Sequence, residues 1–326
     1  RPRCSTIMTA TVVAFGAHVL DILGRPVTRI PEGQGGAILE QIRIAPAGSA
    51  AGTAVGLAKL GLEVASVGAV GDDTLGDVMM RALASFGIDT SHVVRKPGVQ
   101  TSASILPIRP NGDRPALHAI GANPHFTMDD IPWKLIESAA HLHMGGTDVM
   151  RGLGRSGAVE ILRRAKAAGA STSMDILSEG APRTLEILAP CLPMVDWFMP
   201  NADQACGLTG AHAPDEAARI LLARGAAGVV LTMGGDGSLM MTARETVRLP
   251  AYEIAVVDTS GCGDAYCAGF IRAMLLGWTP RECMRLANAA AALVAQGLGS
   301  DAGIIDLDHT IRFMNETAMR AEAREG

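Results

Sequence analysis

Val257-Asp258-Thr259-Ser260-Gly261-Cys262-Gly263-Asp264-Ala265 is the segment from which most of this chain can be understood. The apolar run at 252–257 predicts a buried strand and residues 265–276 predict a helix, so the glycines fall on a strand-to-helix turn. Such a turn directs unpaired backbone N–H groups at one point, and the helix dipole favours an anion there. The segment therefore predicts a phosphate site.

Asp264 lies in the first turn of the predicted helix. A bound phosphate would repel this carboxylate unless the carboxylate has a purpose, such as accepting a proton from an attacking hydroxyl. We therefore interpret Asp264 as a general base. In the alternative interpretation the two glycines only serve a tight turn, and Asp264 only favours the helix dipole.

Residues 258–264 closely resemble the second signature of the ribokinase/PfkB family of carbohydrate kinases, whose usual form is Asp-Thr-Thr-Gly-Ala-Gly-Asp. The resemblance implies that Gly261, Cys262 and Gly263 form an anion hole for the transferring phosphate and that Asp264 deprotonates the acceptor hydroxyl. It also implies an α/β, ribokinase-like fold, with a central, mostly parallel sheet flanked by helices and a small β lid. We expect one kinase domain over residues 9–326.

Composition excludes several other classes of protein. The 326 residues are 48% hydrophobic, enough for a large core, and the net charge of −5 favours neither nucleic acid nor an anionic membrane as a partner. The six cysteines have no Cys-x-x-Cys spacing, and no apolar run reaches about 18 residues. We expect reduced thiols and a cytoplasmic protein, with Met8 as a natural start and residues 1–7 as a remnant.

The rest of the chain alternates apolar runs with helical patterns, which is typical of a parallel sheet. Two stretches, 26–45 and 101–120, break this rhythm with short strands and turn residues, and we predict that they form the β lid. Exposed lid strands need cover, so we expect a homodimer through the lid. His141 and His143 lie on one side of a predicted strand, but no carboxylate or cysteine is spaced to complete a metal site.

The sugar site is predicted from three positions. Asp21 follows the first predicted strand, 9–16, and the resemblance implies that it holds sugar hydroxyls; a loop Asp that caps a turn is the alternative. Gly48 at the start of a helix and Asn123 after the second lid stretch are the other substrate candidates. Ribokinase-type sites carry larger polar residues near Val19, at Gly52 and near 145–146. We therefore expect ribose to be a poor substrate here. A bulkier sugar derivative should be a better substrate, and a derivative that carries its own anionic group is one option.

The nucleotide side is predicted from the same resemblance. Thr232, Gly234 and Gly237 match a turn that lies beside the nucleotide, although a simple β-turn needs the same residues. Asn201 matches the first residue of the family motif Asn-x-x-Glu, and Gln204 replaces the glutamate of that motif, which organises magnesium in the family. Asn288 matches a position on the adenine side of the nucleotide. Asp258 and Ser260 match residues that border a potassium site in some members of the family. A neutral amide at 204 predicts weaker binding of Mg²⁺.

Together these patterns predict an ATP-dependent sugar kinase that requires Mg²⁺, and the resemblance to family members that need potassium adds K⁺ as a candidate activator. One alternative is a nucleoside kinase of the same fold, which the shortage of aromatic residues near Asp21 and Gly48 disfavours. Another is a catalytically silent sugar-binding regulator, which has no use for a carboxylate at Asp264.

Overall fold

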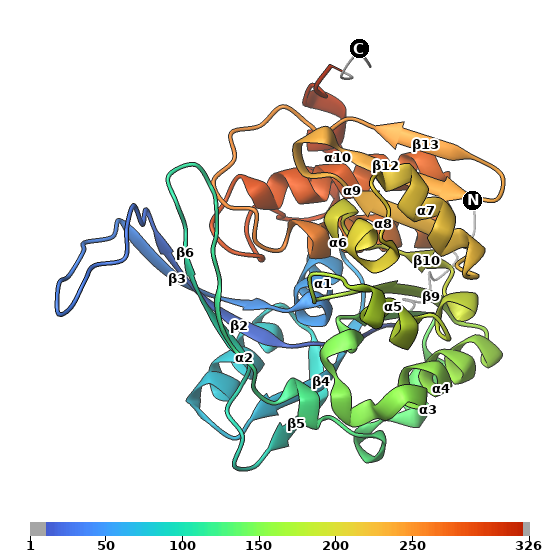
Figure 1. Cartoon of the computed structure of the whole chain (residues 1–326), viewed down its shortest axis with the longest axis horizontal. Coiled ribbons are helices and arrows are strands. Elements are labelled where there is room, and N and C mark those ends of the chain that lie inside the picture. The colour runs from blue at the N-terminus through green and yellow to red at the C-terminus, as the bar shows by residue number, and fades with distance from the viewer. Residues whose placement is uncertain (1–10, 322–326) are drawn as a thin grey trace, which may run out of the picture.

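A nine-stranded sheet forms the body of the protein in the computed structural model, which describes residues 11–321 (Figure 1). Its strand order is β13-β12-β11-β10-β9-β8-β1-β4-β5. Strand β12 runs antiparallel to both neighbours, and all other neighbouring pairs are parallel. The strands are β1 Val12–Gly16, β4 Val64–Gly71, β5 Asp89–Lys96, β8 His141–Gly145, β9 Ser171–Asp175, β10 Trp197–Phe198, β11 Gly228–Thr232, β12 Ser238–Thr242 and β13 Thr246–Leu249. The predicted mostly parallel sheet is confirmed.

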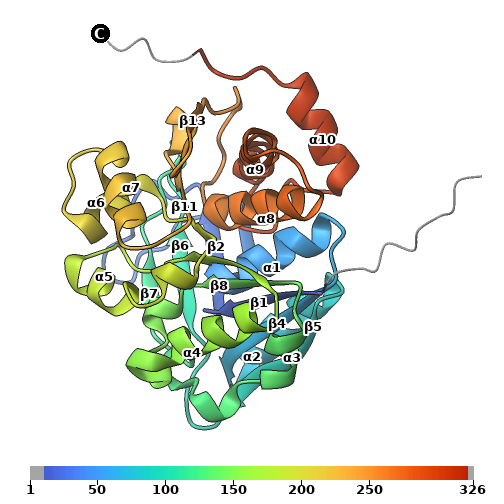
Figure 2. The same ribbon diagram turned by 90° about the vertical axis from the view of Figure 1, so that its right-hand side faces the viewer.

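Helices cover both faces of this sheet, and the alternation of side chains along β1 shows why. Val13 and Phe15 pack into a core shared with α3 to α7, whereas Val12 and Ala14 pack into a core shared with α1, α2 and α8 (Figure 2). The helices are α1 Ser49–Lys59, α2 Thr74–Ser85, α3 Trp133–Ser138, α4 Gly154–Ala167, α5 Pro182–Leu188, α6 Ala202–Thr209, α7 Pro214–Ala223, α8 Cys262–Leu275, α9 Pro280–Ala295 and α10 Leu307–Glu316.

A second sheet, which we call the lid, projects from one side of the body (Figure 1). Its order is β3-β2-β6-β7, with β2 and β6 parallel and the other pairs antiparallel. The lid strands are β2 Val19–Arg25, β3 Gln41–Ala47, β6 Ala103–Pro107 and β7 Leu117–Ala119. Strand β2 precedes the predicted stretch 26–45, and residues 26–40 form a loop because their prolines and glycines do not favour a strand.

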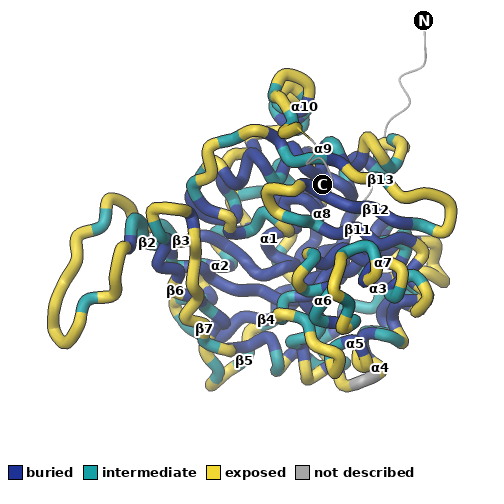
Figure 3. Tube along the Cα trace, turned by 45° about the horizontal axis from the view of Figure 1, so that its top comes forward, coloured by how far each residue is buried: buried dark blue, intermediate teal, exposed yellow. Residues whose placement is uncertain are grey.

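Many residues of the outer lid strands and of the lid loop are exposed (Figure 3), and several of these exposed residues are apolar. Ile42 is 69% exposed and Leu117 is 62% exposed, and Ile44 and Ile105 are each about half exposed. Isolated apolar side chains are common on protein surfaces, but several on one small sheet form a patch that favours association.

The predicted strand at 252–257 is wrong. The segment makes one isolated bridge, between Tyr252 and Met319, and its other backbone hydrogen bonds run to Ala318 and Ala295 rather than to a strand of the sheet. Val256 is 46% exposed. An apolar, β-branched run has the same pattern whether it joins a sheet or lines the surface of a pocket, so composition alone did not separate the two cases.

Two expectations concern the whole chain. Within residues 11–321, no helix combines the length and the apolar character that crossing a membrane requires. Over the same residues the cysteines are free thiols, namely Cys191, Cys206, Cys262, Cys267 and Cys283. Met8 and residues 1–7 lie outside the described residues.

Candidate active site

The anion loop, residues 258–264, joins the segment after β13 to the N-terminus of α8. Gly261 caps the helix with a φ of 72°, and a Cβ there would lie 2.3 Å from the Cβ of Ser300, so only glycine fits. Gly263 is exposed, and a Cβ on it would meet open space. The first N–H groups of a helix have no partner within the helix, so the loop presents donors toward this space.

Asp258 holds the loop in this shape. Its Oδ1 accepts hydrogen bonds from the backbone N of Ser260 at 2.9 Å and from the Ser260 hydroxyl at 2.8 Å, and its Oδ2 accepts one from the backbone N of Gly299 at 2.8 Å. Both carboxylate oxygens of Asp258 are thus buried and accept hydrogen bonds. The side chains of Asp258 and Ser260 therefore fasten the anion loop to the loop that follows α9.

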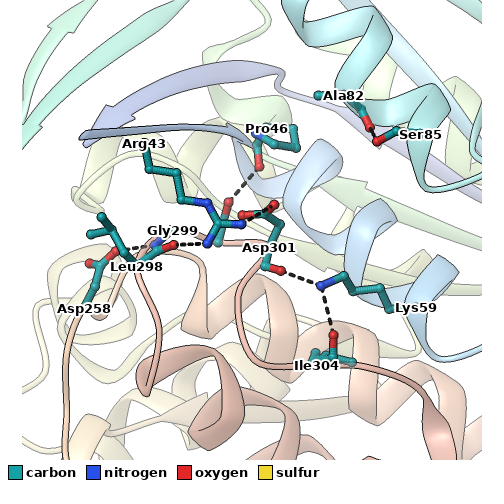
Figure 4. A network of polar contacts seen from close by, with 11 residues as sticks. Arg43, Pro46, Lys59, Ala82, Ser85, Asp258, Leu298, Gly299, Asp301 and Ile304 are labelled. Carbon is teal, nitrogen blue, oxygen red and sulfur yellow. Dashed lines mark hydrogen bonds and ion pairs between the residues drawn. The ribbon is translucent and has the colours of Figure 1, made fainter. Parts of the chain in front are cut away.

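Figure 4 shows how that second loop, 298–304, is itself held. Arg43 on the lid donates to the carbonyl oxygen of Leu298 at 2.6 Å and pairs with the Asp301 carboxylate at 2.8 Å. Lys59 at the end of α1 donates to the carbonyl oxygens of Asp301 at 2.5 Å and Ile304 at 2.9 Å. The lid, α1 and the anion loop are thus connected through one segment.

Asp264 points from the first turn of α8 toward α1. Burial raises the pKa of this carboxyl to about 7, the negative charge of Asp21 adds to the rise, and the positive charge of Arg114 opposes it. A carboxyl with a pKa near neutrality can accept a proton at physiological pH. Burial also raises the pKa of the neighbouring Cys262 thiol to about 12, so that thiol stays neutral and Cys262 can contribute to the anion loop only through its backbone.

Asp21 lies within β2 of the lid and not in a loop beyond β1, which corrects the predicted placement. The chain turns directly from β1 into the lid, so the lid strand itself carries this carboxylate. Asp21 is buried, which raises its pKa to about 6, while a hydrogen bond with Ser104 and the charge of Arg114 oppose the rise. The structure therefore brings Asp21 and Asp264 into electrostatic contact, as a site that binds and deprotonates a hydroxyl requires.

The other two predicted substrate residues lie against the short segment that connects β1 to β2 of the lid. Gly48 has a φ of 85°, and a Cβ there would lie 2.7 Å from the carbonyl oxygen of Ala17. Asn123 accepts a hydrogen bond from the backbone N of His18 at 3.0 Å and donates to the carbonyl oxygen of His18 and the hydroxyl of Ser102, both at 2.9 Å. Contact of Gly48 or Asn123 with substrate stays a prediction.

A cavity of ≈ 190 Å³ opens beside the anion loop. The predicted nucleotide residues Thr232, Gly234, Gly237 and Asn288 line it together with Thr259, Cys262 and Gly263. Sequence reasoning missed its apolar walls, which include Tyr252, Ile254 and Tyr266, because nothing in an isolated apolar residue marks it as part of a pocket. Asn201 lies on a neighbouring hollow that shares Thr232 with this cavity.

Asn201 and Gln204 form a reciprocal cap at the start of α6. Asn201 accepts a hydrogen bond from the backbone N of Gln204 at 2.8 Å, and the Oε1 of Gln204 accepts one from the backbone N of Asn201 at 3.0 Å. The Gln204 amide also donates to the carbonyl oxygens of Ile176 at 3.1 Å and Ser178 at 2.9 Å. The amide therefore fastens the loop after β9, a role that a glutamate could not fill.

A cluster of three buried polar side chains lies behind the anion loop, and the sequence analysis did not predict it. The structure places a carboxylate and a thiol, Asp175 and Cys267, beside His143, with ligand atoms within 4.8 Å of one another. The Nε2 of His143 has no hydrogen-bond partner and lies 4.0 Å from Oδ1 of Asp175. Burial raises the pKa of Asp175 well above its usual range, and the negative charge of Asp264 raises it further. Asp175 therefore lies within electrostatic range of the proposed base.

Backbone donors at a helix N-terminus, a carboxyl of raised pKa beside them and an adjoining cavity define a site for phosphoryl transfer to a hydroxyl. Comparison with known proteins agrees. Residues 9–306 match the profile described as pfkB family carbohydrate kinase. The chain is 26% identical to deoxyribokinase of Salmonella typhi over 311 residues, which cover 93% of this chain and 98% of that protein.

Two further comparisons point the same way. Ribokinase of Haemophilus influenzae is 26% identical over 282 residues, which cover 84% of this chain and 89% of that protein. The structure of Arabidopsis thaliana ribokinase complexed with ribose and ATP superposes with a TM-score of 0.79 at 23% identity, covering 94% of this chain and 99% of that one. The chain belongs to the pfkB family of carbohydrate kinases. It is a sugar or nucleoside kinase, a phosphotransferase with an alcohol group as acceptor.

Proposed function

We propose that the protein transfers the γ-phosphate of ATP to a hydroxyl of a sugar or sugar derivative, with Asp264 as the general base. The observation that carries this proposal is the position of Asp264 in the first turn of α8, at the end of the anion loop, with its carboxylate directed at α1. Burial and the negative charge of Asp21 raise the pKa of Asp264 to about 7. A base poised near neutral pH is the group that activation of a hydroxyl needs.

In this proposal each part of the site has one task. Asp21 on the lid holds hydroxyls of the acceptor and directs one of them at Asp264. The backbone N–H groups of Gly261, Cys262 and Gly263 stabilise the charge on the transferring phosphoryl group. Because Asp21 belongs to the lid, closure of the lid over the acceptor would also exclude water, which otherwise accepts the phosphoryl group.

The cavity beside the anion loop supports a nucleotide as the donor. Its apolar walls suit a base, and Asn288, whose amide donates to the carbonyl oxygen of Pro250 at 3.2 Å, lies on that side. Mg²⁺, when bound, would neutralise charge on the phosphates. Since both ends of the Gln204 amide are engaged with backbone groups, the protein donors fit this ion only weakly, and the nucleotide and water would supply most of its ligands.

The acceptor pocket favours a substrate other than ribose. Of the three positions that carry larger polar residues in ribokinase-type sites, Val19 is apolar here, and Gly52 and Gly145 have no side chain. A Cβ at Gly52 would lie 2.2 Å from Oδ2 of Asp264, and a Cβ at Gly145 would lie 2.5 Å from the backbone N of Ala50. The protein therefore offers fewer hydrogen-bond partners to the hydroxyls of a small pentose, and we propose that a bulkier acceptor is the better substrate.

Three accompanying properties are also proposed. K⁺ would bind between Asp258, Ser260 and the 298–304 loop, where the buried Oδ1 of Asp301 has no hydrogen-bond partner. Equal rates in potassium and in a large organic cation would oppose this. A second copy of the chain would cover the apolar face of the lid, which sedimentation can test. The free thiols are consistent with the cytoplasm.

The proposed function is tested by ADP release across hexoses, pentoses, sugar acids, sugar phosphates and nucleosides. We expect turnover that depends on a sugar-type acceptor and a drop in kcat of about 10²–10⁴-fold in Asp264→Asn, with ATP affinity little changed. A preference for nucleosides would favour the nucleoside kinase, and sugar binding without any ADP release would favour the regulator. Near-wild-type turnover in Asp264→Asn would refute the assignment of the base.

A further inference from the structure

Arg114 lies in the loop between β6 and β7 of the lid, and its side chain reaches across to the anion loop. We propose that Arg114 is a catalytic residue that binds the transferring phosphoryl group. This inference rests on the proposed kinase function and deepens it, because it assigns to the lid a direct part in phosphoryl transfer in addition to holding the acceptor.

The position of Arg114 is set by contacts on both sides. Its Nε donates a hydrogen bond to the hydroxyl of Thr259 at 3.2 Å, and Thr259 lines the nucleotide cavity. The tip of the same loop lies over the approach to the anion loop, because a Cβ on Gly112 would be 3.5 Å from Cγ1 of Val256. The hydrogen bond uses Nε, which leaves the two Nη groups of the guanidinium for a ligand.

Hydrogen bonds within the β6–β7 loop fix the turn that precedes Arg114. The backbone N of Arg109 donates to the carbonyl oxygen of Asp113 at 2.8 Å, and Oδ1 of Asn111 accepts from the backbone N of Asp113 at 3.1 Å. Arg109 also anchors the loop to the neighbouring lid segment by donating to the carbonyl oxygen of Val27 at 3.0 Å. A turn fixed in this way presents the next residue, Arg114, in a defined direction.

Electrostatics identify what Arg114 faces. The positive charge of Arg114 opposes the burial-driven rise in the pKa of Asp21 and of Asp264, so its guanidinium lies within electrostatic range of both carboxyls. The charge of Arg114 also opposes the rise in the pKa of the Cys262 thiol, in the middle of the anion loop. One cation is therefore directed at the point where the acceptor, the base and the phosphate hole meet.

A phosphoryl group at this point needs such a cation. The carboxylates of Asp21 and Asp264 repel it, and the backbone N–H groups of the anion loop carry only partial charges. During transfer the acceptor oxygen forms a bond to the γ-phosphorus, the bond from that phosphorus to the bridging oxygen breaks, ADP leaves, and Asp264 takes the proton of the hydroxyl. Arg114 keeps its proton throughout and neutralises the equatorial oxygens, for which the planar guanidinium is well shaped.

The experiment compares wild type with Arg114→Met, Arg114→Lys and a control, Arg29→Met, which changes an exposed arginine elsewhere in the lid. With the best acceptor from the screen, we expect Arg114→Met to lower kcat by about 10²–10³-fold with both KM values within about threefold of wild type. Arg114→Lys should recover part of kcat, since it keeps the charge and loses the fork. Arg29→Met should match wild type.

A second measurement does not depend on turnover. The gain in Tm caused by ADP with aluminium fluoride, beyond that caused by ADP alone, reports binding of a phosphoryl mimic, and it should be lost in Arg114→Met and kept in Arg29→Met. If wild type releases no ADP with any acceptor, the proposed function fails, and equal gains in wild type and Arg114→Met would then overturn this inference separately. An unchanged kcat in Arg114→Met, or a defect confined to KM for anionic acceptors, would also overturn it and would make Arg114 an acceptor-binding residue.

Discussion

Replacing Gly52 with alanine should displace Asp264, the proposed general base, because the atoms nearest to the added Cβ all belong to that residue. Gly52 lies on α1 facing α8, and a Cβ there would lie 2.2 Å from Oδ2, 2.8 Å from Cγ and 3.0 Å from Cβ of Asp264. Ordinary van der Waals contact begins at about 3.4 Å, so the carboxylate must move by about 1 Å or α1 must move away from α8.

The size of the effect follows from these distances. Overpacking of this kind costs about 1–3 kcal/mol, and an alanine within a helix recovers about 1 kcal/mol relative to glycine, so the loss of stability should be about 0–2 kcal/mol. Displacement of a catalytic group by about 1 Å costs on the order of 10²-fold in rate. We therefore expect Gly52→Ala to lose about 100-fold in kcat while it remains folded.

The assay is the initial rate of ADP release at saturating substrates, with urea unfolding as the measure of stability. Gly56→Ala is the matched control, because a Cβ there would lie 2.6 Å from the Cβ of Ala268, on the same pair of helices but away from Asp264. It should lose stability to a similar degree and keep kcat. A kcat for Gly52→Ala within threefold of wild type, or equal losses of kcat in both variants, would refute displacement of the base.

Two further predictions concern the pH dependence and the metal. The proposed base Asp264 accepts a proton only when it is ionised, and burial raises its pKa to about 7, so kcat/KM should rise with pH through neutrality. Asp21→Asn removes a negative charge that raises this pKa, so the midpoint should shift to lower pH; a shift in the other direction would contradict the pairing of the two carboxyls. Gln204→Glu should lower the free Mg²⁺ needed for half-maximal rate, since it restores a carboxylate. It should also lower Tm, since the lost amide donates to Ile176 and Ser178, and an unchanged magnesium titration would remove position 204 from the metal site.

Features that depend on a few neighbouring residues were predicted well. The helix predicted at 265–276 is α8, Cys262–Leu275, and Asp264 lies in its first turn, because the residues that start a helix lie within a few positions of one another. The alternation of strands and helices was likewise readable from local periodicity. The strand predicted at 252–257 failed because an exposed pocket wall and a buried strand share one pattern.

Asp21 shows the limit of spacing arguments. Its distance from the first strand predicted a position just beyond the end of that strand, but a count of residues did not reveal that the chain enters the lid at once and carries Asp21 within β2. Spacing likewise did not reveal that Gly48 and Asn123 lie against the backbone at Ala17 and His18, and their contact with substrate stays a prediction.

The sequence by itself determined the turn at 258–264 and the place of Asp264 in the first turn of the helix, because these features depend on the glycines and the cap of one short segment, from which we propose the phosphate site. Only the tertiary structure decided what surrounds Asp264. Arg114 meets Thr259 across 145 residues of chain, Gly52 meets Asp264 through the packing of α1 on α8, and Asp175 lies behind through the register of β8 and β9. Such contacts depend on how whole elements pack, and no local pattern in the chain records that packing.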